Sequence, residues 1–213
     1  MSLALPVGLL LLGLVVAWAA DRLADILVGD RSRPAGRDLL VTIHAAAALA
    51  NLAAGSVYGA TLPLLAALAV VAALTAVTVT DLRSSLIPNR LLVGAALLTA
   101  PLVMAAGLQA PVDMVLGALV CGGLMLLVAL LARGGMGGGD VKLSAYIGLV
   151  LGWRQGLVAL AIGVLLGGLA GVSALVARRR GLRDAIPYGP YLAAGAVLAL
   201  LGGEALLRWW LGG

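Results

Sequence analysis

The chain consists of long apolar runs separated by short breaks that are charged or rich in Pro and Gly. A membrane-spanning helix needs about 20 apolar residues, with a working range of about 17 to 25. Division at the breaks predicts an all-α polytopic membrane protein in which residues 1–213 form a single transmembrane domain. The eight expected transmembrane helices, of which the sixth is short, cover residues 3–20, 39–57, 62–80, 89–107, 111–132, 140–153, 155–177 and 189–211.

The composition supports lipid as the main solvent. Hydrophobic residues make up 63% of the chain and charged residues 11%, whereas a soluble domain has about 25% charged residues. The 30 glycines fit this picture because small residues let membrane helices approach closely. Gly163, Gly167 and Gly171 recur every fourth residue, which predicts a helix–helix contact. We favour a contact within the chain over one between subunits.

The basic residues are distributed unevenly between the two sides of the predicted membrane domain. One side has only Arg154 and Arg208, and the other has the remaining twelve of the 14 Lys and Arg residues. The positive-inside rule therefore places loops 21–38, 81–88, 133–140 and 178–188 in the cytoplasm and both termini outside. This orientation signal also explains the net charge of +5 without a nucleic-acid partner.

The first apolar run, residues 3–20, resembles a secretory signal only superficially. A signal peptide has its positive charge before the apolar stretch, whereas no basic residue precedes Arg22 here. We therefore expect a retained first membrane helix.

The first unusual loop follows the third apolar run, where residues 80–89 read TDLRSSLIPN. A charged residue at the edge of a membrane segment is costly, so Asp81 requires an explanation. Pro88 suits the first turn of the next helix, because its missing N–H would have no partner there. A simple alternative is that Asp81 and Arg83 form a surface ion pair, which contributes little stability.

The second unusual loop is rich in glycine, and residues 134–143 read GGMGGGDVKL. A P-loop is excluded because Asp140 and Val141, rather than Lys and Ser or Thr, follow the last glycine. Such a loop allows close approach by an extended peptide, and Asp140 lies near a helix N-terminus, where an anion is favoured. Lys142 either stabilises charge near Asp140 or anchors the helix at the cytoplasmic surface.

Two aspartates on the same predicted side of the membrane are the minimum requirement for an aspartyl protease. Two carboxyl groups held about 3 Å apart cannot both ionise, so one keeps a proton. The ionised group then acts as a general base on water, and the protonated group hydrogen-bonds the scissile carbonyl. This chemistry needs no metal, and the shortage of His, Cys and Glu predicts that none is bound.

The third unusual stretch leads into the last apolar run, where residues 185–195 read AIPYGPYLAAG. A helix start would explain one proline and one interfacial tyrosine. The whole cluster predicts a packed re-entry of the chain beside the site.

Together these three stretches resemble the type IV prepilin peptidases, which belong to the GxGD aspartyl proteases. In this sequence the GxGD element is Gly137 to Asp140. The resemblance implies that Asp81 and Asp140 are the catalytic pair of a membrane aspartic endopeptidase. It implies substrate-binding or site-shaping roles for Arg83, Pro88, Asn89, Gly137, Gly139, Lys142, Pro187, Tyr188, Gly189 and Pro190.

The resemblance also implies the partners and the location of the protein. The partners would be prepilins or pseudopilins with basic leader peptides, cut just after a leader glycine at the cytoplasmic face of the inner (plasma) membrane. Longer members have a cysteine-rich insertion in the first cytoplasmic loop, whereas residues 21–38 contain no cysteine. A Gly-Ser-Phe-x-Asn-like stretch is also missing, and Asp21 stands near the position of its Asn. Proteolysis would need no cofactor, and S-adenosylmethionine would be needed only if N-methylation is retained.

Several other polar residues have simpler interpretations. Cys121 lies within an apolar run and is interpreted as a packing residue, and His44 and Asn51 are expected to form interhelical hydrogen bonds. The acids of loop 21–38 are either part of a solvated mixed-charge loop or a means of attracting a basic leader, with Asp21 and Asp25 as the candidates.

Two rival functions have weaker support. A transporter or scaffold would explain the helices and glycines, but transporters usually place polar groups near the membrane midplane, not around two aspartates on one side. A presenilin-type GxGD protease cuts within membrane helices. The Ile-Pro-Asn and Pro-Tyr-Gly-Pro elements favour the prepilin group instead.

Overall fold

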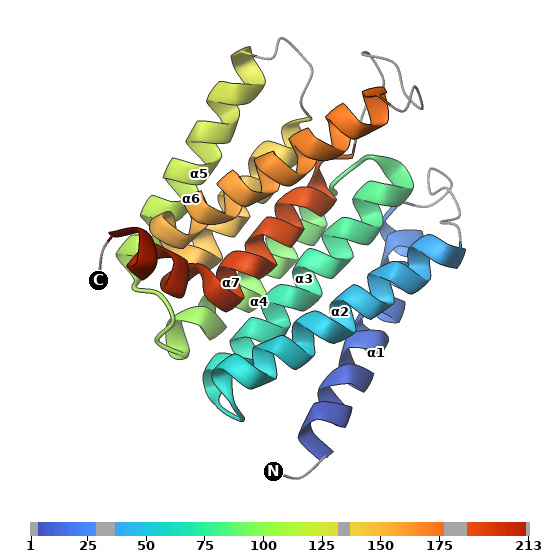
Figure 1. Cartoon of the computed structure of the whole chain (residues 1–213), viewed down its shortest axis with the longest axis vertical. Coiled ribbons are helices and arrows are strands. Elements are labelled where there is room, and N and C mark those ends of the chain that lie inside the picture. Colours follow the sequence, from blue (N-terminus) through green and yellow to red (C-terminus); the bar gives the residue numbers. More distant parts are fainter. Residues whose placement is uncertain (1–3, 29–36, 132–136, 177–186, 212–213) are drawn as a thin grey trace. The chain divides into compact units, whose positions relative to one another are not determined.

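The computed structural model describes residues 4–28, 37–131, 137–176 and 187–211 (Figure 1). Within these residues the chain forms seven helices and no strand. The helices are α1 (Ala4–Val28), α2 (Arg37–Tyr58), α3 (Leu62–Ser84), α4 (Asn89–Ala105), α5 (Pro111–Leu131), α6 (Gly138–Val176) and α7 (Gly189–Leu211). The all-α fold class is therefore confirmed.

The chain divides into two compact units, residues 1–112 and 113–213. The first unit contains α1 to α4, and the second contains α6, α7 and all but the first two residues of α5. That residues 1–213 form a single membrane domain stays a prediction.

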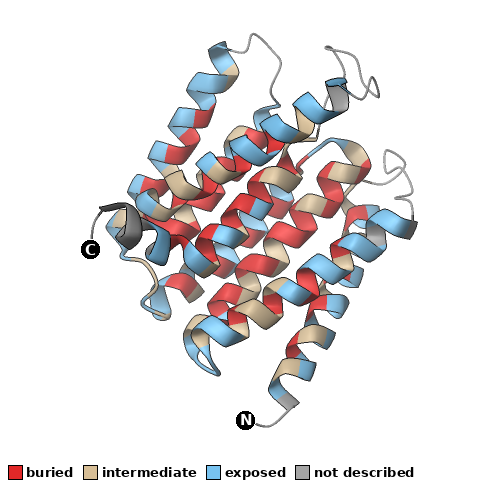
Figure 2. Cartoon of the chain, viewed as in Figure 1, coloured by how far each residue is buried: buried red, intermediate tan, exposed pale blue. Residues whose placement is uncertain are grey.

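Helix α3 is the central helix of the first unit, because it contacts α1, α2 and α4. Its apolar segment is 56% buried, against 28% to 33% for those of α1, α2, α5 and α6 (Figure 2). Helices α1 and α2 pack closely where Gly13 faces α2, since a Cβ at Gly13 would lie 2.8 Å from the Ala47 carbonyl oxygen. Asp81 therefore belongs to the most buried helix of its unit.

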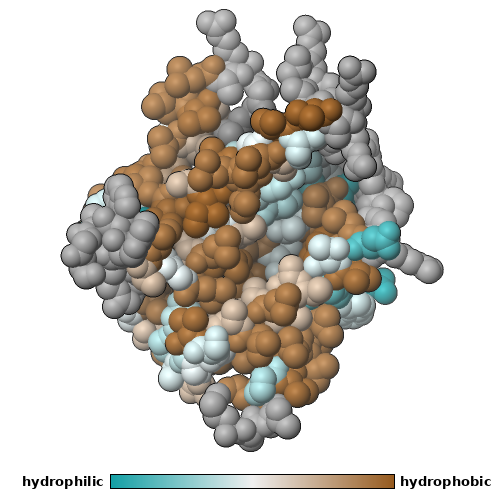
Figure 3. Space-filling view, in the orientation of Figure 1, coloured by the Kyte–Doolittle hydropathy of each residue, from teal (hydrophilic) through white to brown (hydrophobic). Residues whose placement is uncertain are grey.

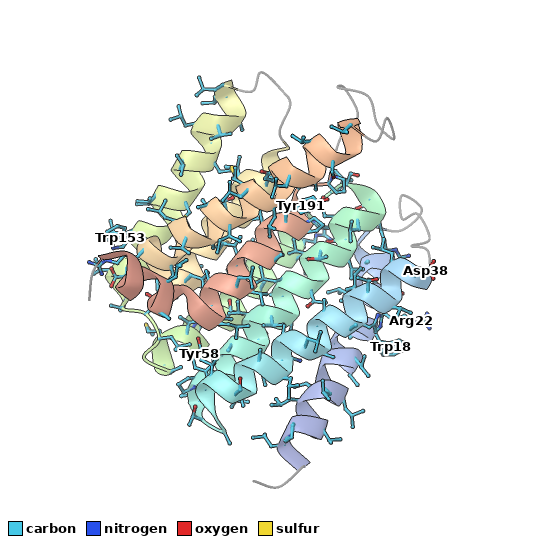
Figure 4. The ribbon with its side chains drawn as sticks, viewed as in Figure 1. Trp18, Arg22, Asp38, Tyr58, Trp153 and Tyr191 are labelled. Carbon is cyan, nitrogen blue, oxygen red and sulfur yellow. The ribbon has the colours of Figure 1, made fainter. Side chains whose placement is uncertain are left out.

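Aromatic side chains lie near both ends of α2. Figure 4 shows Trp18, Arg22 and Asp38 at one end and Tyr58 at the other end of α2. The Arg22 guanidinium carbon lies 5.5 Å from the centroid of the Trp18 ring, a distance at which a cation and an aromatic face attract each other. Trp and Tyr are enriched where membrane helices meet water, so both ends have the side chains expected there.

In the second unit, α6 folds back on itself at Gly152. This glycine has φ 72° and ψ 173° inside the helix, a positive φ that an L side chain adopts only with strain. In a straight helix Gly148 and Gly156 would be about 12 Å apart along the axis. However, a Cβ on Gly156 would lie only 3.1 Å from the Gly148 Cα, so the segments before and after Gly152 pack against each other.

Glycines also bring α5 and α7 close to α6. A Cβ at Gly117 of α5 would lie 2.8 Å from the Gly148 carbonyl carbon, and one at Gly163 would lie 2.9 Å from the Leu192 Cα of α7. A Cβ at Gly167 would meet the ring of Tyr188. The prediction that this glycine stripe makes a contact within the chain is therefore confirmed for Gly163 and Gly167.

The structure bears on two expectations about the helices. The expected division between segments 140–153 and 155–177 is confirmed by the turn at Gly152, which separates α6 into two helical parts; the count of eight transmembrane helices stays a prediction. The expected loop 21–38 is wrong at its ends, since residues 21–28 continue α1 and α2 begins at Arg37. Ala24 is buried on this extension of α1, and the acids of the extension pair with α3, so the extension has two reasons to stay helical.

Five of the described helices contain a segment long and apolar enough to cross a membrane. These segments are Leu5–Val28, Val41–Tyr58, Leu62–Ser84, Pro111–Leu131 and Gly138–Ser173, and the apolar helices Asn89–Ala105 and Gly189–Gly203 are shorter. Apolar side chains cover most of the coloured surface in Figure 3. The sidedness of the termini stays a prediction.

Candidate active site

Asp81 lies in the last turn of α3, and its side chain is only 5% exposed. The helix is capped four residues later by Ser85, which has a left-handed φ of 52° and donates its N–H to the Asp81 carbonyl oxygen at 2.7 Å. The Ser84 hydroxyl donates to the Thr80 carbonyl at 2.6 Å. Asp81 is therefore a buried carboxyl group at a helix end, where the backbone no longer continues in helical geometry.

The connection from α3 to α4 is short and partly buried. Ile87 is 9% exposed, and Pro88 caps α4 with an extended backbone of φ −64° and ψ 132°. The Pro88 carbonyl oxygen accepts the N–H of Leu91 at 3.0 Å. Asn89 begins α4 and is exposed. Pro88 was expected in the first turn of the helix; it is instead the N-cap residue, immediately before the first helical residue, and so still marks the helix start.

Arg83 extends from α3 to two carboxylates of α1. Its Nη1 donates to Asp21 Oδ1 at 2.6 Å and to the Asp21 carbonyl oxygen at 3.1 Å, and its Nη2 donates to Asp25 Oδ1 at 2.5 Å. The Arg83 side chain is 8% exposed, against 27% for Asp21 and 46% for Asp25. These acids are therefore anchored to a buried arginine and are not part of a solvated loop.

Asp140 lies in the first turn of α6 and is 9% exposed. Its backbone N–H donates to the Gly137 carbonyl oxygen at 3.1 Å, and its own carbonyl oxygen accepts the Ser144 hydroxyl at 2.8 Å. A Cβ at Gly137 would lie 3.6 Å from Asp140 Oδ2, so this glycine borders the carboxylate directly. The positive end of the helix dipole favours the ionised form of a carboxyl group at this position.

The other residues expected near Asp140 differ in exposure. Gly139 is half-buried and Lys142 is exposed, which is compatible with both interpretations of the lysine. Residues 134–136 of the glycine-rich loop lie outside the described residues, as do Ala185 and Ile186 of the third stretch.

Tyr188 packs against the part of α6 that follows Gly152 and is close enough to Asp140 to interact with its charge. Its hydroxyl donates to the Val164 carbonyl oxygen at 3.2 Å, and its ring lies 6.2 Å from that of Tyr191 in an edge-to-face arrangement. Burial raises the pKa of Tyr188 above its ordinary value, and the negative charge of Asp140 raises it further. The predicted packed re-entry is therefore present: Gly189 is buried, and Pro187, Tyr188 and Pro190 are half-buried.

Comparison with known proteins identifies the family. The model of the type IV leader peptidase family matches residues 68–172. The chain is 37% identical over 163 residues to a prepilin leader peptidase/N-methyltransferase of Bacillus subtilis, covering 75% of this chain and 64% of that protein. It is 34% identical over 161 residues to the protein of the same name from Aeromonas hydrophila, covering 69% and 52%. The chain belongs to the type IV leader peptidase family.

This chain thus spans about half to two thirds of the length of these curated relatives. No solved structure matches it. Membership of the type IV leader peptidase family and the apolar helices together make it a multi-pass membrane protein.

The stretch that matches the type IV leader peptidase model contains the first two unusual loops, and with them Asp81 and Asp140. The third stretch, at residues 185–195, lies beyond the matched residues, as does all of α1. Asp81 belongs to the first unit and Asp140 to the second. A shared site for the two carboxyl groups therefore stays a prediction.

Sequence reasoning missed the anchoring of Arg83 to α1. The available signal was the spacing of Asp21 and Asp25, because residues four apart lie on the same face of a helix. That signal requires the helix to continue past Ala20, which a rule based on apolar runs does not predict.

Within the described residues, no group of three His, Cys, Asp or Glu side chains could hold a metal ion.

Proposed function

We propose that this protein is a membrane aspartic endopeptidase that cleaves the leader peptides of type IV prepilin-like or pseudopilin proteins at the cytoplasmic face of the inner membrane. One observation supports this most strongly. The stretch matched by the type IV leader peptidase model contains two buried carboxyl groups at helix ends, Asp81 and Asp140, which are 5% and 9% exposed. Burying a charged group at the edge of an apolar helix costs free energy, so the presence of such a group points to a function.

In this proposal the two carboxyl groups share one proton around a water molecule. Like charges held close together cannot both ionise, so one carboxyl group keeps its proton. The ionised carboxylate takes a proton from water, whose oxygen adds to the scissile carbonyl carbon, while the protonated carboxyl group hydrogen-bonds the carbonyl oxygen. Collapse of the tetrahedral intermediate breaks the C–N bond, and the leaving amine takes the proton that the first carboxylate removed from water.

The neighbouring residues have supporting roles in the proposal. Gly137 leaves space beside the Asp140 carboxylate, and Gly139 permits an extended peptide to approach the backbone. Tyr188, set between Pro187 and the Gly189-Pro190 pair, forms one wall beside Asp140. Lys142 is exposed at the surface, and Pro88 and Asn89 shape the loop that follows Asp81. The substrates would be prepilins with basic leaders.

N-methylation is the second activity in the names of the two relatives, and S-adenosylmethionine would be its methyl donor. One buried, unpartnered polar atom among the described residues can be tested as part of a site for that group. Asn51 Oδ1 is the buried side-chain polar atom without a hydrogen-bond partner among them. This atom is a single hydrogen-bond acceptor, and its buried neighbours along α2 are Ala47, Ala48 and Ala54. One acceptor among alanines cannot bind an adenosine and a sulfonium. We therefore derive no methyl-transfer step.

The test is incubation of the purified protein, in detergent or reconstituted vesicles, with a prepilin-like substrate, and mass analysis of the products. Wild-type protein should release the leader by a cut after its glycine. Asp81→Asn and Asp140→Asn should each reduce cleavage by roughly 10²–10⁴-fold, the usual contribution of a general acid or base. Full activity in either variant would exclude the shared-proton mechanism. The mass of the mature product also reports any added methyl group.

A further inference from the structure

We propose that Arg83 is a positioning residue for Asp81, and that Asp21 and Asp25 are the anchors through which it acts. The inference rests on the proposed function, because it assigns Asp81 to the reaction. Three hydrogen bonds join the Arg83 guanidinium to α1, at 2.6 Å and 3.1 Å to Asp21 and at 2.5 Å to Asp25. Ion pairs of arginine with carboxylates fix geometry as well as charge, because the guanidinium is a planar, rigid fork.

The last turn of a helix needs such a restraint. Helix ends fray because their final carbonyl groups lack partners within the helix. Beyond Asp81 the helix has only Leu82, Arg83 and Ser84 before the left-handed Ser85. The Arg83 side chain is 8% exposed, so its contact with α1 is part-buried and differs from a fully exposed surface pair of little value.

The position of Arg83 in the sequence gives this restraint a direction. Residues two apart on a helix do not face each other, so a side chain two positions after Asp81 points to a different side of α3. By holding Arg83, α1 fixes the rotation of the last turn and directs Asp81 away from α1. Ala17, Ala20 and Ala24 are buried in this part of α1 and provide a firm surface behind the acids.

Docking of the substrate is the rival explanation for the acids. Two carboxylates, Asp21 and Asp25, share the one guanidinium of Arg83, so these three groups together have a net negative charge that could attract a basic leader. The two roles affect different kinetic constants. A positioning role acts on kcat for every substrate, whereas a docking role acts on KM for basic leaders.

The first arm of the experiment changes Arg83. Arg83→Met should lower kcat about 10–100-fold for a basic leader and for a neutralised leader alike, because a displacement of about 1 Å costs about 100-fold. KM should change less than about threefold. Arg83→Lys should restore part of kcat, since lysine keeps the charge but lacks the fork. Arg90→Met, at an exposed arginine near the start of α4, is the matched control and should cleave like wild type.

The second arm changes the anchors, which keeps the inference testable if Arg83→Met fails to fold. Asp21→Asn and Asp25→Asn should each lower kcat for both leaders, and more strongly together. Asp21 should have the larger effect, because it is the less exposed of the two and accepts from Arg83 through both its side chain and its backbone. Asp38→Asn, at an exposed acid in the first turn of α2, is the matched control.

Three results would overturn the positioning role: unchanged kcat in folded Arg83 variants and anchor variants, a lower melting temperature with wild-type kcat, or a rise in KM confined to the basic leader. The last result would support docking instead. Failure of the proposed function would look different, since wild-type protein would then not cleave prepilin or Asp81→Asn would remain active. A wild-type enzyme that depends on Asp81 but not on Arg83, Asp21 or Asp25 disproves only this inference.

Discussion

The ring of Tyr188 lies across Gly167 so closely that a methyl group built on Gly167 would stand 2.5 Å from Cε2 and 2.8 Å from Cζ of the tyrosine. This contact joins the chain just before α7 to the part of α6 that follows the Gly152 turn. The Tyr188 hydroxyl also donates to the Val164 carbonyl oxygen, one helical turn earlier. Because Gly167 has no side chain, it leaves space for the ring of Tyr188, a residue on which the charge of Asp140 acts.

Gly167→Ala should therefore displace the Tyr188 ring and lower both stability and cleavage. Overpacking a tight contact costs about 1–3 kcal/mol, which exceeds the gain of about 0.5–1 kcal/mol from replacing glycine by alanine within a helix. Gly168→Ala is the matched control, because a Cβ there would meet nothing within 4 Å. Thermal unfolding in detergent and the prepilin assay measure the two effects. Equal behaviour of the two alanine variants would contradict the importance of this contact.

The titration of Tyr188 should report its proximity to Asp140. Its pKa is raised, first by burial and then by the Asp140 charge, so the folded protein holds the phenol proton more tightly than the unfolded chain. The corresponding contribution to stability is complete below the ordinary tyrosine pKa of about 10 and is lost as the pH rises through the folded-state pKa. Asp140→Asn should move the titration of Tyr188 to lower pH.

Ultraviolet difference spectra can measure this shift. The alkaline transition present in wild type and missing in Tyr188→Phe belongs to Tyr188, and the same subtraction in the Asp140→Asn background gives its new midpoint. An unchanged midpoint would mean that the two groups do not interact electrostatically.

The sequence predicted helix positions well where the breaks contain Pro or Gly. The starts expected at Leu62, Asn89, Pro111 and Gly189 all agree with the structure. These starts are local events, because proline and glycine restrict or release the backbone whatever lies around them. The end of α1 was predicted wrongly, because its last turns contain charged residues, and only the partner on α3 makes those residues compatible with a packed helix.

The candidate site, like the helices, was predictable from the sequence only in part. Asp81 and Asp140 stood out because each is an acid at the edge of an apolar run. The ring of Tyr188 over Gly167 could not be predicted residue by residue, although a close contact of the glycine stripe was expected. The expected interhelical hydrogen bond of Asn51 is not made by its Oδ1 in the described residues. Such contacts depend on which helices become neighbours, and apolar periodicity does not specify this.

The fold-back of α6 should depend on a glycine at 152. Gly152→Ala forces a side chain into a left-handed conformation with φ 72°, which costs roughly 1–2 kcal/mol. The turn is also crowded, because a Cβ on the neighbouring Gly117 would lie 2.7 Å from the Gly152 carbonyl carbon. Gly123→Ala, where a Cβ would meet nothing within 4 Å, should leave the melting temperature unchanged or slightly raised. A Gly152→Ala protein as stable as wild type would contradict the strained turn.

The predicted orientation can be tested at the two ends of α3. Ala60 and Leu86 are both exposed and flank this helix, whose 23 residues extend about 34 Å, enough to cross a hydrocarbon core of about 30 Å. Cys121→Ala removes the single, buried thiol and provides the background for Ala60→Cys and Leu86→Cys. A membrane-impermeant maleimide should label position 60 in intact spheroplasts and position 86 only in inverted vesicles. The opposite pattern would place the Asp81 end of α3 outside the cell, where it could not cut a leader that is still in the cytoplasm.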